Sequence, residues 1–223
     1  KRGLNWFLWA GNDQLLLSSG DWNFLIYSVY STSSLKRLDL RTSEVIELNT
    51  RSKLSRDHVI FIDPAGRYII SHQRRRPLQS PHAIRIDLTD GSEVVVEKPS
   101  HNIDRWLADP AGNIRAGIAY SEKKWRVFYR DKPGENLEKI AIKRRDIFEG
   151  DVVEEIYLLG GTDRSIIIAN SKTGRFGAYN YEIRTDAFGE AVYEHPTADV
   201  TDVVLDNAGK PIGVRFEAEK PGQ

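Results

Sequence analysis

A short phrase that favours a tight turn recurs along the chain, and it limits the possible fold more than any other feature. Asp63-Pro64-Ala65-Gly66 and Asp109-Pro110-Ala111-Gly112 each lie between apolar runs, and Asp206-Asn207-Ala208-Gly209 is a third copy. In such a turn the proline fixes φ, the aspartate carboxylate caps the turn and the glycine accepts a positive φ. The first two aspartates are 46 residues apart, and the last two are 97 apart. The sequence therefore predicts hairpins repeated at a nearly constant spacing.

Two weaker copies complete this series. Gly160-Gly161-Thr162-Asp163 lies near the middle of the longer gap, and Gly11-Asn12-Asp13 extends the series backwards. No apolar stripe at helical spacing persists over three turns, so we expect few helices. Four short strands repeated every ~40–50 residues are typical of a β-propeller blade. A β-sandwich, the competing all-β fold, would not predict a turn phrase at constant spacing.

The predicted fold is an all-β propeller with about four four-stranded antiparallel blades and half of a fifth. Residues 1–223 form one propeller region, with blades at about 5–48, 58–97, 103–141 and 153–194 and a half blade at 200–216. A closed propeller pairs its last blade with its first, and the half blade finds no complementary strands near residue 1. The sequence therefore predicts an arc of a larger propeller.

Composition narrows the class of protein. Lys+Arg and Asp+Glu both number 32, and this balance argues against a dedicated nucleic-acid binder, which needs a basic surface. No run approaches the ~18 apolar residues of a membrane span, so we expect no membrane partner. The absence of cysteine excludes disulfides and thiolate metal sites. The absence of methionine, even at the first position, favours a fragment or omitted residues over chance depletion.

Several segments, taken in order, resemble one family. They are Arg37–Thr42 (Arg-Leu-Asp-Leu-Arg-Thr), Arg85–Asp90 (Arg-Ile-Asp-Leu-Thr-Asp), Trp106–Gly112, Phe128–Asp131, Glu194–Pro196 and Asp199-Val200. With this succession the chain resembles the N-terminal β-propeller of bacterial prolyl oligopeptidase family serine peptidases. The acylaminoacyl-peptidase and dipeptidyl-peptidase-like branch is the most similar, and the resemblance runs from about Trp9 to Phe216.

The resemblance implies a non-catalytic domain of a serine peptidase. In that family the propeller precedes an α/β-hydrolase domain that carries the catalytic serine, aspartate and histidine, and it gates access so that short peptides enter. The implied partners are that C-terminal domain of the same polypeptide and a peptide substrate, with no cofactor. The G-x-S-x-G nucleophile elbow does not occur in this sequence, and Gly91-Ser92, the nearest approach, lacks the second glycine. The chain is therefore expected to contain no catalytic residues.

Two groups of residues are candidate contacts with the substrate or with the hydrolase domain. Arg74, Arg75 and Arg76 interrupt the second blade, and an arginine side chain can bind a carboxylate through two parallel hydrogen bonds. A solvated loop is the alternative, as it is for the second basic run at residues 143–145. Trp22 and Tyr27 belong to an aromatic insertion in the first blade, and aromatic side chains contribute much of the energy at interfaces. Packing between neighbouring blades is the alternative there.

The histidines and tryptophans receive plainer interpretations. The five histidines show neither i, i+4 pairing nor an H-E-x-x-H motif, so we predict structural or exposed roles and no metal site. Trp106 and Trp125 lie within regular strands and are predicted to belong to the core.

Two other functions stay open at this stage. A stand-alone propeller could serve as a non-enzymatic binding scaffold, and the absence of a downstream serine elbow would favour it. A glycan-active propeller would need paired carboxylates facing a central channel, and no spacing in the sequence singles out such a pair.

Overall fold

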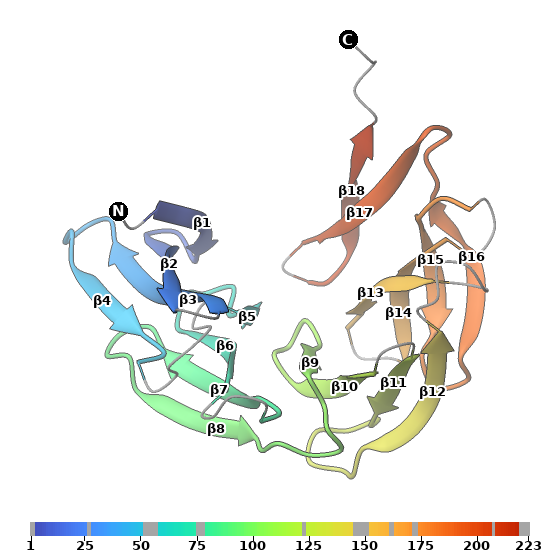
Figure 1. The fold of residues 1–223 in the computed structure, drawn as a ribbon, viewed down its shortest axis with the longest axis horizontal. Coiled ribbons are helices and arrows are strands. Elements are labelled where there is room, and N and C mark those ends of the chain that lie inside the picture. Colours follow the sequence, from blue (N-terminus) through green and yellow to red (C-terminus); the bar gives the residue numbers. More distant parts are fainter. Residues whose placement is uncertain are drawn as a thin grey trace. The chain divides into compact units, whose positions relative to one another are not determined.

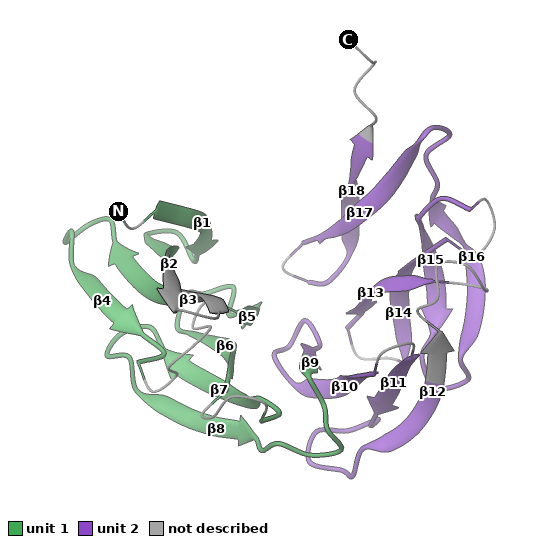
Figure 2. Cartoon of the chain, in the orientation of Figure 1, with its two compact units in different colours: residues 1–106 green, residues 107–223 purple. Residues whose placement is uncertain are grey.

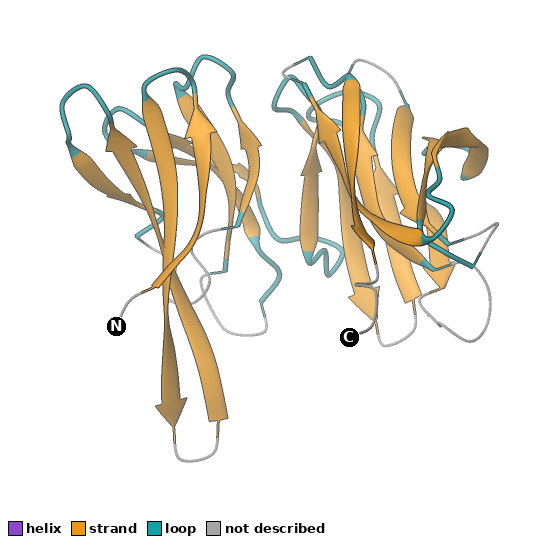
Figure 3. Cartoon of the chain, turned by 90° about the horizontal axis from the view of Figure 1, so that it is seen from above, coloured by secondary structure: helices purple, strands orange, loops and turns teal. Residues whose placement is uncertain are grey.

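The computed structural model contains strands and turns, and no helix occurs within the ranges that it describes (Figure 3). These ranges are 3–25, 28–50, 58–74, 79–121, 124–144, 152–160, 163–170, 174–206 and 208–218. Since they hold no helix, they hold no candidate for a membrane-spanning helix either. Four four-stranded antiparallel sheets and one two-stranded sheet confirm the predicted all-β propeller class.

The chain divides into two compact units, residues 1–106 and 107–223 (Figure 2). Unit 1 contains two complete sheets, each in simple up-and-down order (Figure 1). The first comprises β1 (Gly3–Ala10), β2 (Gln14–Leu25), β3 (Ser28–Asp39) and β4 (Val45–Leu48). The second comprises β5 (Val59–Ile62), β6 (Tyr68–Gln73), β7 (His82–Asp87) and β8 (Glu93–Glu97).

Unit 2 contains the remaining sheets, although β9 starts at the last two residues of unit 1. The third sheet comprises β9 (Arg105–Ala108), β10 (Ile114–Ser121), β11 (Lys124–Tyr129) and β12 (Glu138–Arg144). The fourth comprises β13 (Val153–Leu158), β14 (Arg164–Ala169), β15 (Gly177–Glu182) and β16 (Ala187–Tyr193). The two-stranded sheet pairs β17 (Ala198–Leu205) with β18 (Pro211–Ala218).

The repeated turn phrase forms the predicted hairpins. Asp109 Oδ1 accepts hydrogen bonds from the backbone N–H groups of Ala111 (3.0 Å) and Asn113 (2.9 Å). Gly112 has a φ of +80°, a conformation that glycine adopts without steric cost. In unit 1, Gly66 has a φ of +69°, and a Cβ there would lie 2.8 Å from the carbonyl oxygen of Ala10. Glycine is thus required at this turn both by its conformation and by the neighbouring backbone.

The β2–β3 hairpin is longer than the sequence predicted. We expected these strands to end near Ser19 and to resume at Leu35, yet their pairing continues from Gly20↔Ser33 to Leu25↔Ser28. The pairing with β1 stops at Gly20, and the pairing with β4 stops at Leu35. The distal part of the hairpin is therefore a two-stranded ribbon. Its backbone groups satisfy each other without an alternating apolar pattern, which explains why the sequence did not reveal it.

Strand β12 also extends beyond its predicted end. Residues 143 and 144 were expected to start a charged connector, but they pair with Trp125 and Lys124 of β11. The ladder continues because β11 supplies a partner for each of these residues.

Apolar side chains form cores between neighbouring sheets of each unit. In unit 1 one core joins the first two sheets, and its buried members are Ala10, Leu16, Leu35, Leu48, Ile69, Ile84, Ile86 and Leu88. In unit 2 the larger core joins the third and fourth sheets through residues such as Val127, Ile167 and Tyr179. A further core links the fourth sheet to the two-stranded sheet through Ile166, Ile168 and Val200.

Candidate functional site

Of the five predicted contact residues, Arg74 is the one whose side chain the structure describes. It follows β6, and its Nη2 lies 3.5 Å from Asp104 Oδ1 in a partly exposed ion pair. Arg75, Arg76 and Tyr27 lie outside the described residues. Trp22 belongs to β2, where its backbone pairs with Ser31, and its side chain is not described.

Arg74 adjoins a cluster of buried polar side chains at the end of β6. Ser71 Oγ donates to the carbonyl oxygen of His58 (2.9 Å) and accepts from Asn49 Nδ2 (3.1 Å). Gln73 Nε2 donates to Asn49 Oδ1 (2.8 Å). We call Asn49, His58, Ser71, His72 and Gln73 the β6-end cluster. A polar group buried in this way costs free energy unless it is hydrogen-bonded, and here most of the polar side-chain atoms find partners.

His72 is the central residue of the β6-end cluster. Its side chain is almost fully buried, and its ring stacks on that of His58 at 4.4 Å between centroids with an interplanar angle of 8°. His72 Nε2 accepts a hydrogen bond from the backbone N–H of Trp106 at 2.9 Å. Burial first, and then the electrostatic effects of His58 and Arg105, lower the pKa of His72 well below its usual value. The imidazole is therefore neutral at pH 7.

Trp106 confirms the prediction of a core residue and adds a polar role to it. The side chain is fully buried, and its indole Nε1 donates to the carbonyl oxygen of Pro81 at 2.8 Å. Trp106 thus binds two points of the second sheet, one at the end of β6 and one just before β7. Trp125, the other predicted core tryptophan, is also buried.

This arrangement was not predicted from the sequence. His72 and Trp106 are 34 residues apart, and nothing in either neighbourhood indicates that they meet. One signal was available: Ser71-His72-Gln73 places three polar residues at the end of the apolar run Ile69-Ile70. A strand that continues into the interior with polar residues requires hydrogen-bonding partners there.

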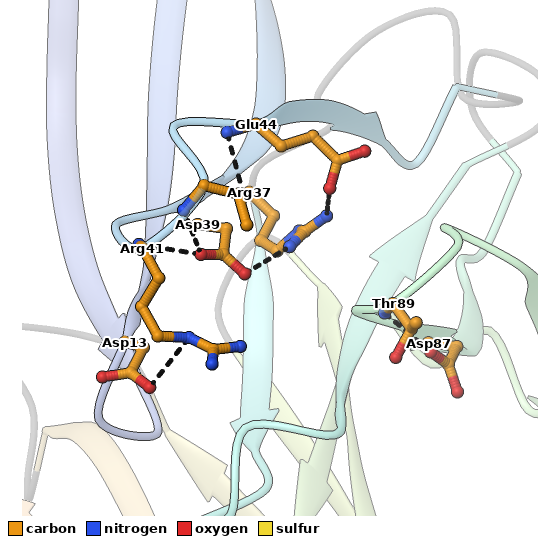
Figure 4. A network of polar contacts seen from close by, with 8 residues as sticks. Asp13, Arg37, Asp39, Arg41, Glu44, Asp87 and Thr89 are labelled. Carbon is orange, nitrogen blue, oxygen red and sulfur yellow. Dashed lines mark hydrogen bonds and ion pairs between the residues drawn. The ribbon is translucent and has the colours of Figure 1, made fainter.

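A second polar network lies at the β3–β4 turn of the first sheet (Figure 4). Buried Arg37 places Nη2 2.9 Å from Glu44 Oε2 and Nη1 3.5 Å from Asp39 Oδ2. Asp39 Oδ1 accepts from the backbone N–H groups of Arg41 (2.9 Å) and Thr42 (3.1 Å). These backbone hydrogen bonds, that from Thr42 first, lower the pKa of Asp39. The network thereby fixes the turn.

The same turn chemistry recurs in the second sheet. Asp87 Oδ1 accepts from the backbone N–H of Thr89 at 2.7 Å, in the part of Figure 4 drawn to the right of the Arg37 network. Arg85 corresponds to Arg37 in the repeated phrase, but it is exposed and its guanidinium carbon lies 3.9 Å from the ring centroid of Tyr68. Because the phrase repeats with its hydrogen bonds, we assign it to the propeller framework and not to a ligand site.

The fourth sheet carries a hollow of about 290 Å³. Its lining includes Arg164, Asn180, Glu182, Phe188 and Gly189. Asn180 Nδ2 donates to the carbonyl oxygen of Glu190, so this amide is engaged within the sheet. The hollow is open, and both polar and apolar side chains line it.

Within the described ranges, no group of three or more histidine, cysteine, aspartate or glutamate side chains could hold a metal ion. His58 and His72 stack face to face, and Nε2 of His72 is already an acceptor for Trp106. The β6-end cluster therefore holds a neutral imidazole at His72, and its described side chains form no metal-ligand set.

The comparisons with known proteins support the fold. No family model matches the chain, and no curated protein matches it by sequence. A structure from a study of two prolyl endopeptidases matches 99% of this chain and 36% of its own, with a TM-score of 0.56 and 12% identity. Prolyl oligopeptidase B from Galerina marginata matches 96% of this chain and 35% of its own, with a TM-score of 0.55 and 9% identity.

A third solved structure is itself a propeller domain. The β-propeller domain of the trilobed protease from Pyrococcus furiosus matches 90% of this chain and 60% of its own, with a TM-score of 0.50 and 13% identity. The chain thus spans about a third to three fifths of the length of these structures. At such low identity the likeness establishes a propeller fold similar to the propeller domains of peptidases.

Proposed function

We propose that this chain is the propeller portion of a serine peptidase related to the prolyl oligopeptidase family, in which it caps the active site of an α/β-hydrolase domain. The observation that carries the proposal is the structural likeness to a prolyl endopeptidase, which covers 99% of this chain but 36% of the other. A propeller that occupies part of a peptidase suggests a supporting role for the same fold here. The missing G-x-S-x-G elbow is consistent with chemistry located in another domain.

The proposed role is steric. A ring of blades around a narrow channel admits an extended peptide and excludes a folded domain. The loop that begins with Arg74 leaves the sheet at the end opposite to the Asp63 turn, because successive antiparallel strands alternate in direction. The β2–β3 hairpin, with Trp22 and Tyr27, leaves the first sheet at the corresponding end. Residues 74–76, Trp22 and Tyr27 are therefore the proposed contacts with the peptide or the hydrolase domain.

The test uses the natural polypeptide that contains this sequence. A fluorophosphonate probe, which reacts with activated serines, is expected to label one serine outside residues 1–223. Residues 1–223 alone are the control and are expected to remain unlabelled. If the natural polypeptide is not labelled, the peptidase function is wrong, and the alternative of a non-enzymatic binding scaffold replaces it.

A second measurement tests the gate itself. The natural polypeptide, not treated with the probe, is given a short peptide and the same segment displayed in a loop of a folded protein. The gate predicts hydrolysis of the free peptide and little or none of the folded substrate. Equal rates on both substrates would overturn the gating role, even for an active peptidase.

A further inference from the structure

The hydrogen bond made by the backbone N–H of Trp106 depends on one uncharged imidazole. His72 Nε2 accepts the Trp106 backbone N–H at 2.9 Å, so the proton of the neutral ring lies on Nδ1. A protonated imidazole carries N–H groups on both nitrogens and has no acceptor. Protonation of His72 would therefore turn this hydrogen bond into a contact between two donors.

The groups around His72 oppose its positive charge. His58 stacks on the ring from the residue before β5, Arg105 belongs to β9, and Arg74 directly follows β6. Ala83, the β7 residue opposite His72, brings no charge. The three bases His58, Arg105 and Arg74 each lower the pKa of His72.

Two carboxylates contact this segment through side chains other than that of His72. Glu93 Oε2 accepts from Gln73 Nε2 at 3.4 Å. Asp104, the nearby carboxylate, lies 3.5 Å from the guanidinium of Arg74 and is partly exposed. From the end of β4, Asn49 Nδ2 contacts the carbonyl oxygen of His72 at 3.4 Å, which fixes the backbone and not the imidazole. A proton on His72 would therefore be buried close to three bases and opposite the Trp106 N–H, where a charge is costly.

We propose that His72 and Trp106 form an acid-sensitive lock, in which a proton on His72 Nε2 releases Trp106 from the end of β6. Trp106 also donates through its indole to the carbonyl oxygen of Pro81, so it contacts both ends of the β6–β7 connection. Protonation of His72 removes the contact at the β6 end. That connection carries Arg74 and was the predicted contact loop. The lock consists of contacts within unit 1. It therefore does not depend on the proposed peptidase function, which needs a hydrolase domain.

The direction of the pH effect follows from linkage. The pKa of His72 is depressed in the locked state, whereas a released histidine has a pKa of about 6.5. The released state therefore binds more protons, and locking is fully favourable above about pH 6.5. Below that value the locking equilibrium weakens by up to about tenfold per pH unit, until the pH reaches the depressed pKa.

The experiment follows the Trp106 amide in the full 223-residue chain. Amide hydrogen exchange, corrected for the intrinsic rate, is measured from about pH 7.5 to about pH 4.5, the range where histidine titrates. We expect the protection factor of the Trp106 amide to fall about tenfold per pH unit below about pH 6.5. Amides of the fourth sheet, such as that of Ile167, are expected to keep their protection.

Two variants separate the lock from general acid lability. His72→Gln keeps a side-chain acceptor that does not titrate, so its Trp106 protection should not change with pH. His101→Asn removes an exposed histidine with a φ of +52°, which asparagine tolerates, and should behave as the unaltered chain. A pH-dependent loss that persists in His72→Gln would overturn the lock.

A direct titration keeps the proposal testable if His72→Gln fails to fold. Imidazole resonances of the unaltered chain report the pKa of His72 by NMR. A depressed pKa, with Trp106 release in step with the titration, supports the lock. A pKa near 6.5, or equal loss of protection at Trp106 and Ile167, contradicts it.

Discussion

Strands β6 and β14 occupy the same place in two blades and fill the interior in different ways. Each has six residues, follows its blade's first hairpin turn and pairs along its whole length with a six-residue third strand. Ile167 and Ile168 near the end of β14 are fully buried in two apolar cores. The corresponding residues of β6 are Ser71 and His72, which are also buried but are hydrogen-bonded. Even the residues opposite them correspond, since Ala83 faces His72 and Ala178 faces Ile168.

The difference shows that the propeller framework does not require polar residues at this position. An apolar strand end is stabilised by the removal of surface from water, which is insensitive to pH and needs no particular partner. A polar strand end is stable only while each buried donor and acceptor keeps its partner. The β6-end cluster therefore makes unit 1 dependent on the protonation of His72, whereas β14 has no such dependence.

The largest expected effect comes from giving β14 the residue of β6. Ile167→Ser removes a fully buried aliphatic side chain and places a hydroxyl in an apolar core. We expect the free energy of unfolding to fall by about 4 kcal/mol, from the cavity and the buried hydroxyl together. Urea unfolding of the full chain measures this change. A loss below ~1 kcal/mol would indicate that the apolar core tolerates polar residues as readily as the β6-end cluster does.

The reverse exchange, His72→Ile, is expected to cost less and to depend on pH. The variant leaves the buried Trp106 N–H without its acceptor, which should lower the free energy of unfolding by ~1–3 kcal/mol at pH 7. Below about pH 6.5 the unaltered chain loses stability because its pKa for His72 is depressed, and the variant does not. The difference in the free energy of unfolding between the two proteins should therefore become smaller as the pH falls. Urea unfolding at two pH values measures it. A difference that widens would contradict the comparison.

Much of this framework could be predicted because its signals are local. The Asp109 turn contains its own cap and its own positive-φ glycine within four residues, and the structure has both. Such turns at a constant spacing indicated the four sheets and the two-stranded sheet. Strand ends were harder to place, since the distal β2–β3 ribbon is defined by the partner strand and not by its own pattern.

The candidate site could not be predicted because its contacts are not local. His58 and His72 meet through the pairing of β5 with β6, and Trp106 reaches them from the next sheet's first strand. No spacing rule links these three residues. The predicted basic run indicated the neighbourhood of the site through Arg74, but it did not identify the histidine whose proton controls it.

Removal of the Ser71 hydroxyl should have a smaller effect than either exchange. Ser71→Ala deletes a donor to the His58 carbonyl and the acceptor of Asn49 Nδ2, and we expect a loss of about 1 kcal/mol. Ser165 of β14 is the matched control, because it is equally buried and donates to the carbonyl oxygen of Tyr181. Thermal unfolding of Ser71→Ala and Ser165→Ala tests whether the first substitution lowers the stability more than the second. Equal losses would show that the Asn49 contact contributes nothing measurable.

The smallest effect on stability is expected for Arg74→Ala. The Arg74 and Asp104 side chains are 42% and 34% exposed and 3.5 Å apart, and such partly exposed pairs contribute between zero and ~1 kcal/mol. We therefore expect the free energy of unfolding, measured in urea, to change by no more than about 0.5 kcal/mol.

Because the substitution hardly changes stability, Arg74 is a sharp probe of the proposed function in the natural polypeptide. If Arg74 binds a substrate carboxylate, Arg74→Ala should raise KM for peptides with a free carboxyl terminus and leave KM for amidated peptides unchanged. Arg74→Lys keeps the charge but loses the two parallel hydrogen bonds. Its KM for peptides with a free carboxyl terminus should therefore lie between the values of the unaltered polypeptide and Arg74→Ala. Equal effects on both peptides would assign Arg74 to the surface of the blade.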